Sequence, residues 1–224
     1  MFGGIARRYD FLNHLLSLNR DRGWRRRAVE LSEGGGPVLD VCAGTGDFTF
    51  EWARRSGLAV GADFCEEMVR LAVAKPAPAT GRACFLAADT LALPFPAGTF
   101  GTVSAAFGIR NVADLRGGLR ELRRVTRPGG QVVILEFATP RNALFRAVYL
   151  LYFLLVLPLV GNLVSGSRDG AYGYLPRSVR RFPGREALKA IMGEEGLSGV
   201  EVHDLSLGIV NAWVGRRPIE RGPR

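Results

Sequence analysis

The chain has 224 residues, 47% of them hydrophobic, which is enough for one domain with a substantial core. Its net charge of +9 is carried almost wholly by arginine, and a basic surface attracts nucleic acid or anionic lipid. The scattered Cys42, Cys65 and Cys84 argue against a disulfide scaffold, and two histidines are too few for a zinc site. We expect reduced thiols, no metal and a cytoplasmic location, because the charged N-terminus lacks an apolar export signal.

Residues 1–33 precede the first predicted strand and are expected to form a helical lid. Apolar side chains recur at helical spacing within residues 9–17, and a basic segment around Trp24 leads into a second apolar stripe. We expect two short helices over the carboxyl ends of the strands. A basic and aromatic run this short more often covers a solvated helix face than it binds nucleic acid.

Residues 38–49 turn from an apolar strand containing Asp40 into a helix, through a sharp turn that includes Gly44, Thr45 and Gly46. The two glycines allow a tight turn and close approach of a ligand to the backbone, and the helix N-terminus faces the turn. This spacing is weak evidence alone. Thr49 stands where a dinucleotide fingerprint has its third glycine, and no Gly-Lys-Ser/Thr follows, which argues against a phosphate-binding P-loop.

Acids at the ends of the next two predicted strands strengthen the signal. The strand at 58–63 ends in Asp63, which is placed to accept hydrogen bonds from both ribose hydroxyls of a nucleoside. The strand at 83–88 ends before Asp89 and Thr90, where an adenine amino group can bind. The acid before the glycine turn, together with these two strand-end acids, resembles the class I methyltransferases that bind S-adenosylmethionine.

The middle of the chain repeats strand and helix. Helices are expected at 48–55, 66–72 and 114–126, a loop with two prolines at 91–100, and strands at 102–106 and 131–136. This order predicts a parallel sheet with right-handed crossovers. Residues 107–112 follow the fourth strand directly, where ligands bind in open α/β sheets.

The segment at 141–183 breaks the pattern as an apolar and aromatic insertion. Its run at 148–160 is nearly all apolar but too short, and too interrupted by Pro158, for a comfortable membrane span. Core packing, a dimer contact and an isoprenoid groove with bilayer contact all fit it. A last helix at 184–195 and a hairpin at 199–215 complete the expectation for 1–224: one Rossmann-like, doubly wound α/β domain with a seven-stranded, mostly parallel sheet.

Several separate stretches resemble the quinone C-methyltransferases of ubiquinone and menaquinone biosynthesis. They include the Tyr-Asp-x-x-Asn opening, Leu-Pro-Phe-Pro at 93–96, Phe-Gly-Ile-Arg-Asn-Val at 107–112, Arg-Pro-Gly-Gly at 127–130 and Leu-Glu-Phe at 135–137. The resemblance implies that S-adenosylmethionine is bound by Thr45, Asp63, Asp89 and Thr90. A further family contact, often Ser, falls on Ala106, where only a backbone contact is expected.

The resemblance also implies a reaction, methylation of a ring carbon of a reduced prenylated quinone, with demethylmenaquinol as the expected substrate. The enzyme has to orient the ring and exclude water. We expect Arg110 to face the substrate oxygen rather than to be a surface arginine, and Asn111, Tyr9 and Asn13 to orient the ring. Expected partners are the quinol, membrane lipid at the inner face of the cell membrane, and a second copy of the chain.

Three alternatives remain open at this stage. The substrate of the same reaction can be the 2-methoxy-6-polyprenyl-benzoquinol precursor of ubiquinone. Methylation of nucleic acid would suit the arginine excess, but the chain lacks an Asn/Asp-Pro-Pro-Tyr/Phe motif and we expect no nucleic-acid partner. A non-catalytic quinone- or cofactor-binding partner is disfavoured by the acids at all three strand ends.

Overall fold

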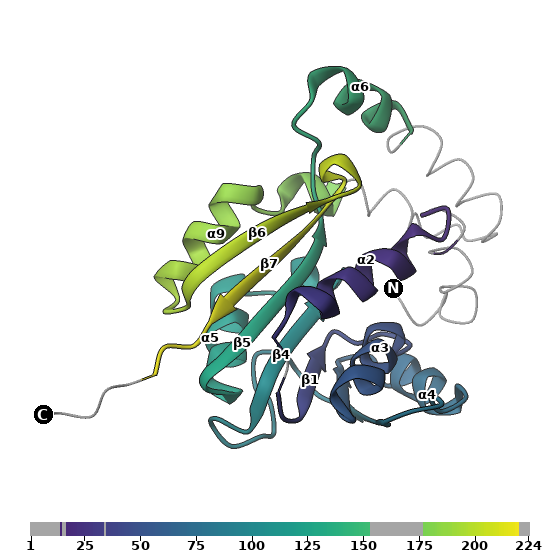
Figure 1. Ribbon diagram of the computed structural model, residues 1–224, viewed down its shortest axis with the longest axis vertical. Coiled ribbons are helices and arrows are strands. Elements are labelled where there is room, and N and C mark those ends of the chain that lie inside the picture. The colour runs from purple at the N-terminus through teal and green to yellow at the C-terminus, as the bar shows by residue number, and fades with distance from the viewer. Residues whose placement is uncertain (1–13, 15–16, 34, 153–176, 220–224) are drawn as a thin grey trace, which may run out of the picture.

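The computed structural model describes residue 14 and residues 17–33, 35–152 and 177–219 (Figure 1). Seven strands form one sheet in the order β3-β2-β1-β4-β5-β7-β6. Strands β1 to β5 are parallel, and β7 runs antiparallel to both of its neighbours, which confirms the doubly wound, mostly parallel sheet. The strands are β1 (Val38–Val41), β2 (Leu58–Asp63), β3 (Arg82–Ala87), β4 (Phe100–Ala106), β5 (Thr126–Phe137), β6 (Ser198–Leu205) and β7 (Val210–Arg216).

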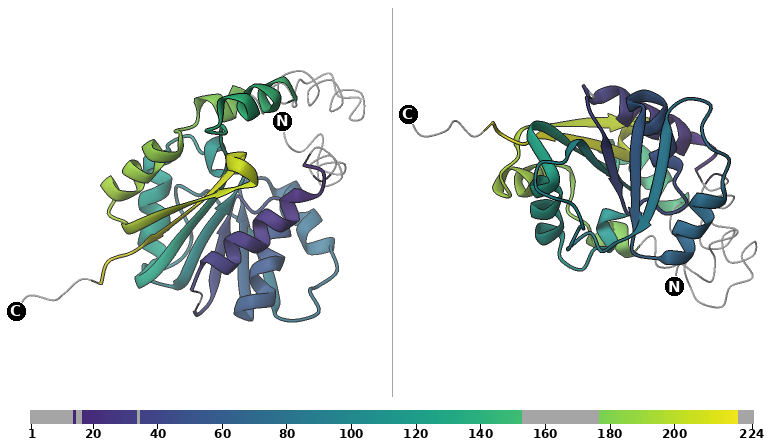
Figure 2. Two further views of the ribbon diagram at one scale, coloured as in Figure 1. Left: turned by 45° about the horizontal axis from the view of Figure 1, so that its top comes forward. Right: turned by 90° about the horizontal axis from the view of Figure 1, so that it is seen from below.

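Helices cover both faces of this sheet, as Figures 1 and 2 show. Apolar side chains of α2 and α3 pack on one face, and those of α5 and α9 on the other. Helix α4 packs against β2 and β3. The helices are α2 (Arg20–Leu31), α3 (Asp47–Ser56), α4 (Glu66–Ala74), α5 (Leu115–Val125), α6 (Ala143–Leu151) and α9 (Arg185–Glu194), with 3-10 turns η2 (Ile109–Asn111) and η4 (Ser206–Gly208).

Two strands begin earlier than the sequence indicates. β4 starts at Phe100 instead of residue 102, and β5 at Thr126 instead of residue 131. Phe100 pairs with Thr126, and the register then shifts before Thr102 pairs with Gln131. The Arg-Pro-Gly-Gly stretch at 127–130 therefore lies within β5 as an irregularity, which accommodates a proline that has no N–H to donate.

Helix α2 belongs mainly to the layer on the sheet. Trp24, Ala28 and Val29 are buried in the core that α2 shares with α3 and the sheet. Beyond its last turn, the Ser32 hydroxyl lies 2.8 Å from the Gln131 side-chain oxygen, at the end of the sheet away from the strand tips. Only its first turns reach the carboxyl edge, and the lid expected for 1–33 stays a prediction for the part outside the described residues.

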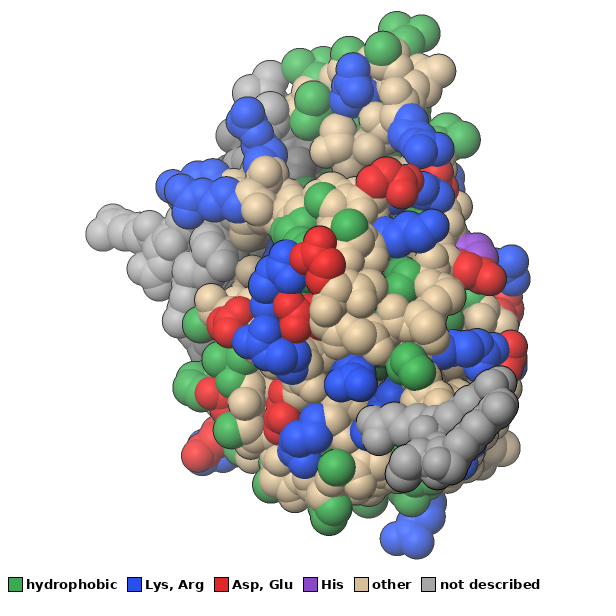
Figure 3. Space-filling model, turned by 90° about the vertical axis from the view of Figure 1, so that its left-hand side faces the viewer, with side chains coloured by type: hydrophobic (Ala, Val, Ile, Leu, Met, Phe, Trp, Pro, Cys, Tyr) green, Lys and Arg blue, Asp and Glu red, His purple; other side chains and the backbone are tan. Residues whose placement is uncertain are grey.

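The predicted insertion at 141–183 begins with α6, which projects beyond the sheet (Figure 1). Hydrophobic and basic side chains gather at this end of the molecule (Figure 3), where Leu144 and Leu151 are exposed. Most of the apolar run at 148–160 lies outside the described residues. Within the part of the chain that the structure describes, no helix combines the length and apolar character needed to cross a bilayer.

Candidate active site

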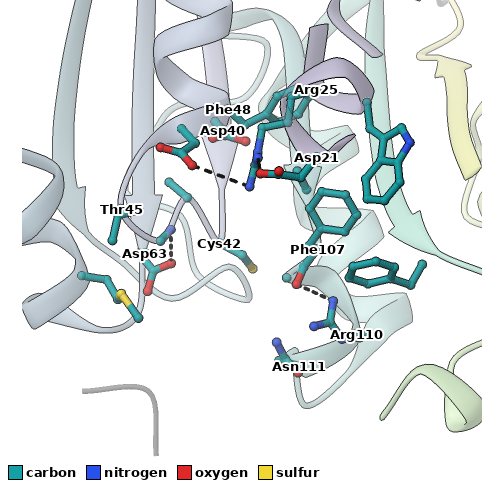
Figure 4. Close-up of a pocket in the computed structure, with 18 of the residues that line it drawn as sticks. Asp21, Arg25, Asp40, Cys42, Thr45, Phe48, Asp63, Phe107, Arg110 and Asn111 are labelled. Atoms are coloured by element: carbon teal, nitrogen blue, oxygen red, sulfur yellow. Dashed lines mark hydrogen bonds and ion pairs between the residues drawn. The ribbon is translucent and has the colours of Figure 1, made fainter. Parts of the chain in front are cut away.

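A cavity of about 750 Å³ opens at the carboxyl ends of the central strands, between the first turns of α2 and helix α6. Figure 4 shows Thr45 and Asp63 on one side of it and Phe107 and Arg110 on the other. We call these the polar side and the aromatic side. The volume lies in the upper part of the range for small-molecule sites, about 300–1,000 Å³, which suits two ligands held together.

The glycine turn after β1 explains why each of its glycines is needed. Gly44 has φ +56° and Gly46, which precedes α3, has φ +87°, both in the left-handed region that favours glycine. A Cβ at Gly44 would meet no atom within 4 Å, so this residue leaves its side of the cavity open to a ligand. A Cβ at Gly46 would lie 2.6 Å from the Phe85 ring.

Asp63 is held in one orientation by the backbone. One carboxylate oxygen accepts a hydrogen bond from the Gly44 N–H at 2.7 Å (Figure 4), and the other accepts one from the Cys65 N–H at 2.8 Å. Burial raises the pKa of Asp63 above its usual value, and these two N–H groups oppose that shift. A carboxylate has about four acceptor sites, so each oxygen can still accept one hydroxyl of a ribose diol.

Asp40 lines the same cavity, but it is buried and its oxygens are used within the fold. It accepts hydrogen bonds from the Thr49 hydroxyl at 2.7 Å and from the Ser104 hydroxyl at 3.0 Å. Burial is the main cause that raises the pKa of Asp40 to about 7. This carboxyl therefore ties the glycine turn to α3 and β4, and it titrates near neutral pH.

The residues after β3 and at the end of β4 complete the polar side. Asp89 is exposed and accepts a hydrogen bond from the Leu91 N–H at 2.9 Å, which orders the turn. The Thr90 hydroxyl lies 3.6 Å from the Cys42 sulfur. Ala106 lines the cavity without a polar side chain. The predicted contacts after β3 and at the end of β4 therefore face one cavity, although they come from separate strands.

A charge network joins α2 to the glycine turn. The Arg25 guanidinium pairs with Asp21 one helical turn earlier (Figure 4). It also lies 3.8 Å from the Asp47 carboxylate. The Lys75 ammonium donates to Asp47 at 2.7 Å and to the Thr45 hydroxyl at 3.0 Å. Burial alone would raise the pKa of Asp47, but the charges of Arg25 and Lys75 hold it below its usual value.

His14 adds to this network without creating a clear cation site. Its ring nitrogens lie 2.7 Å from the Asp21 carboxylate and 3.6 Å from that of Asp47, so three candidate metal ligands lie close together. Arg25 and Lys75 already supply positive charge to the same two carboxylates. The cluster is therefore better explained as a set of ion pairs that fixes α2 against α3.

The aromatic side is built from three rings that are far apart in sequence. The ring centroids of Phe107 and Phe137 lie 4.7 Å apart, and Trp24 lies 6.2 Å from each of them. The Trp24 indole N–H donates to the Ser206 hydroxyl at 2.7 Å, which fixes its orientation. Phe107 has φ +57°, a strained backbone for a bulky residue and one that clusters at functional sites.

Arg110 lines the cavity, but it is not an unengaged cation. Its side chain is 7% exposed and its Nη1 donates to the buried Glu136 carboxylate at 2.6 Å and to the Phe107 carbonyl oxygen. Its Nε donates to the Ser178 hydroxyl at 3.3 Å. Asn111 follows on the same 3-10 turn and also lines the cavity. These contacts show that Arg110 is not the surface arginine that we considered as its alternative.

The structure brings most of the predicted site residues to one cavity. Gly46 is not among the described residues that line the cavity; it precedes α3, and a Cβ there would meet the Phe85 ring, so its expected contact with the cofactor stays a prediction. Tyr9 and Asn13 lie outside the described residues. Sequence reasoning assigned no role to Arg25 and Trp24, although both stand in the basic and aromatic segment before the first strand.

Comparisons with known proteins show the family to which the chain is similar. The ubiE/COQ5 methyltransferase family matches residues 1–217. A ubiquinone/menaquinone biosynthesis C-methyltransferase of Geobacter sulfurreducens is 49% identical over 98% of this chain and 88% of its own length. A demethylmenaquinone methyltransferase of Thermus thermophilus is 48% identical over 97% of this chain and 100% of its own.

A solved structure supports the fold. It is a methyltransferase in complex with the Trm112 methyltransferase activator of Haloferax volcanii, with a TM-score of 0.68 at 18% identity. The match covers 97% of this chain and 98% of that one. At this level of identity the likeness concerns the arrangement of strands and helices alone.

Proposed function

The chain belongs to the ubiE/COQ5 methyltransferase family, and on that premise we propose that it methylates a ring carbon of reduced demethylmenaquinone. The ring carbon bonds to the methyl group of S-adenosylmethionine as the bond between sulfur and methyl breaks. The products are menaquinol, S-adenosylhomocysteine and the proton that leaves the methylated ring carbon. The observation that carries this proposal is one cavity with a polar side built on the strand tips and a facing aromatic side. A nucleoside with an amino acid part suits the first, and a fused aromatic ring suits the second.

The residues of the polar side fit the cofactor. S-adenosylmethionine, when bound, supplies an electrophilic methyl group on a sulfonium. Asp63, with both oxygens already oriented by backbone N–H groups, accepts hydrogen bonds from the ribose hydroxyls. Gly44 lets the cofactor approach the turn, and Asp89 and Thr90 flank the adenine, with Thr45 beside the turn. These residue roles are our proposal.

The aromatic side holds the second substrate. Trp24, Phe107 and Phe137 pack against the quinol ring and keep water from it, so that a ring carbon lies in line with the methyl group. A quinol is already electron-rich, and loss of a hydroxyl proton makes its neighbouring ring carbon a better nucleophile. Orientation and exclusion of water then supply much of the acceleration.

Arg110 stabilises the negative charge that develops on the quinol oxygen. Arginine stays protonated in proteins, so it cannot accept the hydroxyl proton itself. Asn111 lies on the same turn and hydrogen-bonds to the ring oxygens. We also propose that Tyr9 and Asn13, which lie outside the described residues, help to orient the ring.

The rim of the cavity carries the proposed contact with membrane lipid. Leu18 and Phe64 line the cavity and are exposed. Helix α6 directs Phe145 and Tyr149 to the cavity and exposes Leu144 on its surface. An apolar rim beside basic side chains suits an anionic lipid surface, from which a prenylated substrate can enter. Because Cys42, Cys65 and Cys84 are free thiols, we place this contact at the inner, cytoplasmic face of the cell membrane.

Vesicle sedimentation tests this contact. The chain should sediment with phosphatidylglycerol vesicles, and the L144D/L151D variant should stay in the supernatant. L58D is the matched control, because Leu58 is exposed at the amino end of β2, away from the cavity. No binding of the unchanged chain would refute lipid contact. A mass of two chains in light scattering, halved by L144D/L151D, would assign the same surface to a homodimer.

Incubation with radiolabelled S-adenosylmethionine and reduced demethylmenaquinone in detergent tests the reaction. Label should appear in menaquinol and should be absent when RNA replaces the quinol. Label only in a 2-methoxy-6-polyprenyl-benzoquinol would move the assignment to the ubiquinone precursor. Tight cofactor binding in calorimetry without label in either quinol would favour a non-catalytic partner instead.

A further inference from the structure

A buried carboxylate lies directly behind the cavity, at the end of β5. Glu136 is fully buried. It belongs to the Leu-Glu-Phe stretch at 135–137, and the proposed reaction gives it no role. Its neighbour Leu135 packs in the core on the α2 and α3 side, so the alternation of a strand directs Glu136 to the opposite face. Arg110 lines the cavity there, whereas Glu136 is not among the described residues of the lining.

Burying the ion pair between Glu136 and Arg110 costs free energy, so stability alone does not explain it. One Glu136 oxygen accepts hydrogen bonds from Arg110 Nη1 at 2.6 Å and from the Phe137 N–H at 3.0 Å. The other oxygen is buried and has no hydrogen-bond partner among the described residues. Burial raises the pKa of Glu136 despite the opposing charge of Arg110. Buried ion pairs are often replaceable by apolar residues without loss of stability, so another role is indicated.

The contacts of Arg110 define what that role is. Its Nε is bound to Ser178 and its Nη1 to Glu136 and the Phe107 carbonyl, which fixes two corners of a planar group. Nη2 is the guanidinium nitrogen that has no hydrogen-bond partner within the described part of the chain. The guanidinium carbon also lies 5.8 Å from the centre of the Phe137 ring, so the group is held against the aromatic side.

We propose that Glu136 is a positioning residue that aims Arg110 Nη2 at the quinol oxygen. It acts by fixing the plane of the guanidinium and by supplying the countercharge that keeps a cation within an aromatic wall. The inference rests on the proposed function, because it names the residue that makes Arg110 effective in that reaction. Glu136 touches neither substrate nor cofactor.

The E136Q variant tests this role, since it keeps an oxygen acceptor of similar shape and removes the charge. We expect kcat for the quinol to fall about 10- to 100-fold, because a misplacement near 1 Å can cost that much. The cofactor Kd measured by calorimetry should stay within twofold, because the polar side is untouched. E136D, which keeps the charge on a shorter side chain, should recover part of the lost kcat.

A double-mutant cycle with R110M separates positioning from a general structural effect. In the R110M background, E136Q should cause no further loss of kcat, because the residue through which Glu136 acts is gone. The matched control is E121Q, which changes a carboxylate that also pairs with an arginine, Arg124, on α5 and outside the cavity lining. It should leave kcat unchanged.

Three outcomes would overturn the inference. One is a kcat of E136Q within twofold of the unchanged chain. Another is a full multiplicative loss of kcat when E136Q and R110M are combined. The third is an equal loss of kcat in E121Q and E136Q. If E136Q does not fold, E136D in both backgrounds gives the same cycle. Failure of the proposed function can be told apart from failure of this inference, because the unchanged chain itself would then transfer no label to the quinol.

Discussion

The two sides of the cavity are built in different ways. The polar side comes from the tips of β1, β2 and β3, and its orientation depends on backbone groups, as in the two N–H donors that hold Asp63. The aromatic side joins Trp24, Phe107 and Phe137 from three distant segments through contacts between side chains. The polar side forms as soon as the strands take their order in the sheet. The aromatic side forms only when α2 and the segments after β4 and β5 have packed together.

Each side also has a buried carboxyl, and the two have different partners. Asp40 is bonded to the neutral hydroxyls of Thr49 and Ser104, and its pKa rises to about 7. Glu136 is bonded to the Arg110 guanidinium. A carboxyl between hydroxyls can become neutral at moderate pH at little cost, whereas one beside a guanidinium holds a cation in place. The difference suits a binding side and a reacting side.

The largest expected effect lies on the aromatic side. R110M removes the cation proposed to stabilise the quinol oxygen, and we expect kcat to fall about 100- to 1,000-fold, the usual loss for one such donor. Cofactor affinity should be nearly unchanged. R70M is the control, because Arg70 is an exposed arginine on α4. Equal kcat for R110M and the unchanged chain would exclude Arg110 from the chemistry.

The corresponding change on the polar side is D63N. It replaces an acceptor of two backbone N–H groups by an amide that can accept at only one atom, and it removes the charge that binds a diol. We expect the Kd for S-adenosylmethionine to rise about 10- to 100-fold, because a hydrogen bond to a charged group contributes about 1.5–3 kcal/mol. Calorimetry measures it, with D114N on the exposed cap of α5 as control. Unchanged affinity would place the nucleoside elsewhere.

A pair of glycine variants distinguishes packing from access on the polar side. G46A brings a Cβ against Phe85 in a left-handed backbone, and we expect it to lower the free energy of unfolding by about 2–4 kcal/mol. G44A has the same strain but an open environment, and should cost about 1–2 kcal/mol while weakening cofactor binding. Urea denaturation measures the free energy of unfolding of each variant. Equal losses in both variants would contradict the contact with Phe85.

The pH dependence of stability tests Asp40. In the unfolded chain this carboxyl ionises near its ordinary pKa of 3.8, while the folded state keeps its proton until about pH 7. The stabilisation is therefore complete below the unfolded pKa and is lost as pH rises towards 7. From pH 5 to pH 6, the unchanged chain should lose about 1.4 kcal/mol relative to D40N. Parallel stability curves for the two proteins would show that Asp40 is ionised in the folded state.

Several features of the site could be predicted from local sequence because they depend on local geometry. An acid at the end of a predicted strand comes to the carboxyl edge wherever that strand lies in a parallel sheet, which is why Asp63 and Asp89 were identified. Local signals could not show that Gly46 lies against Phe85, because Phe85 comes from β3, a distant part of the sequence. The early start of β5 was hidden by Pro128 and two glycines, which normally end a regular element.

The sequence alone determined the fold class, the strand tips that form the polar side and the resemblance to quinone C-methyltransferases. These depend on hydrophobic periodicity and on short motifs, which are properties of neighbouring residues. Only the tertiary structure decided that Arg110 pairs with Glu136 and that Trp24 meets Phe107 and Phe137. Such contacts arise when distant segments pack together, and no spacing along the chain records which side chains will then touch.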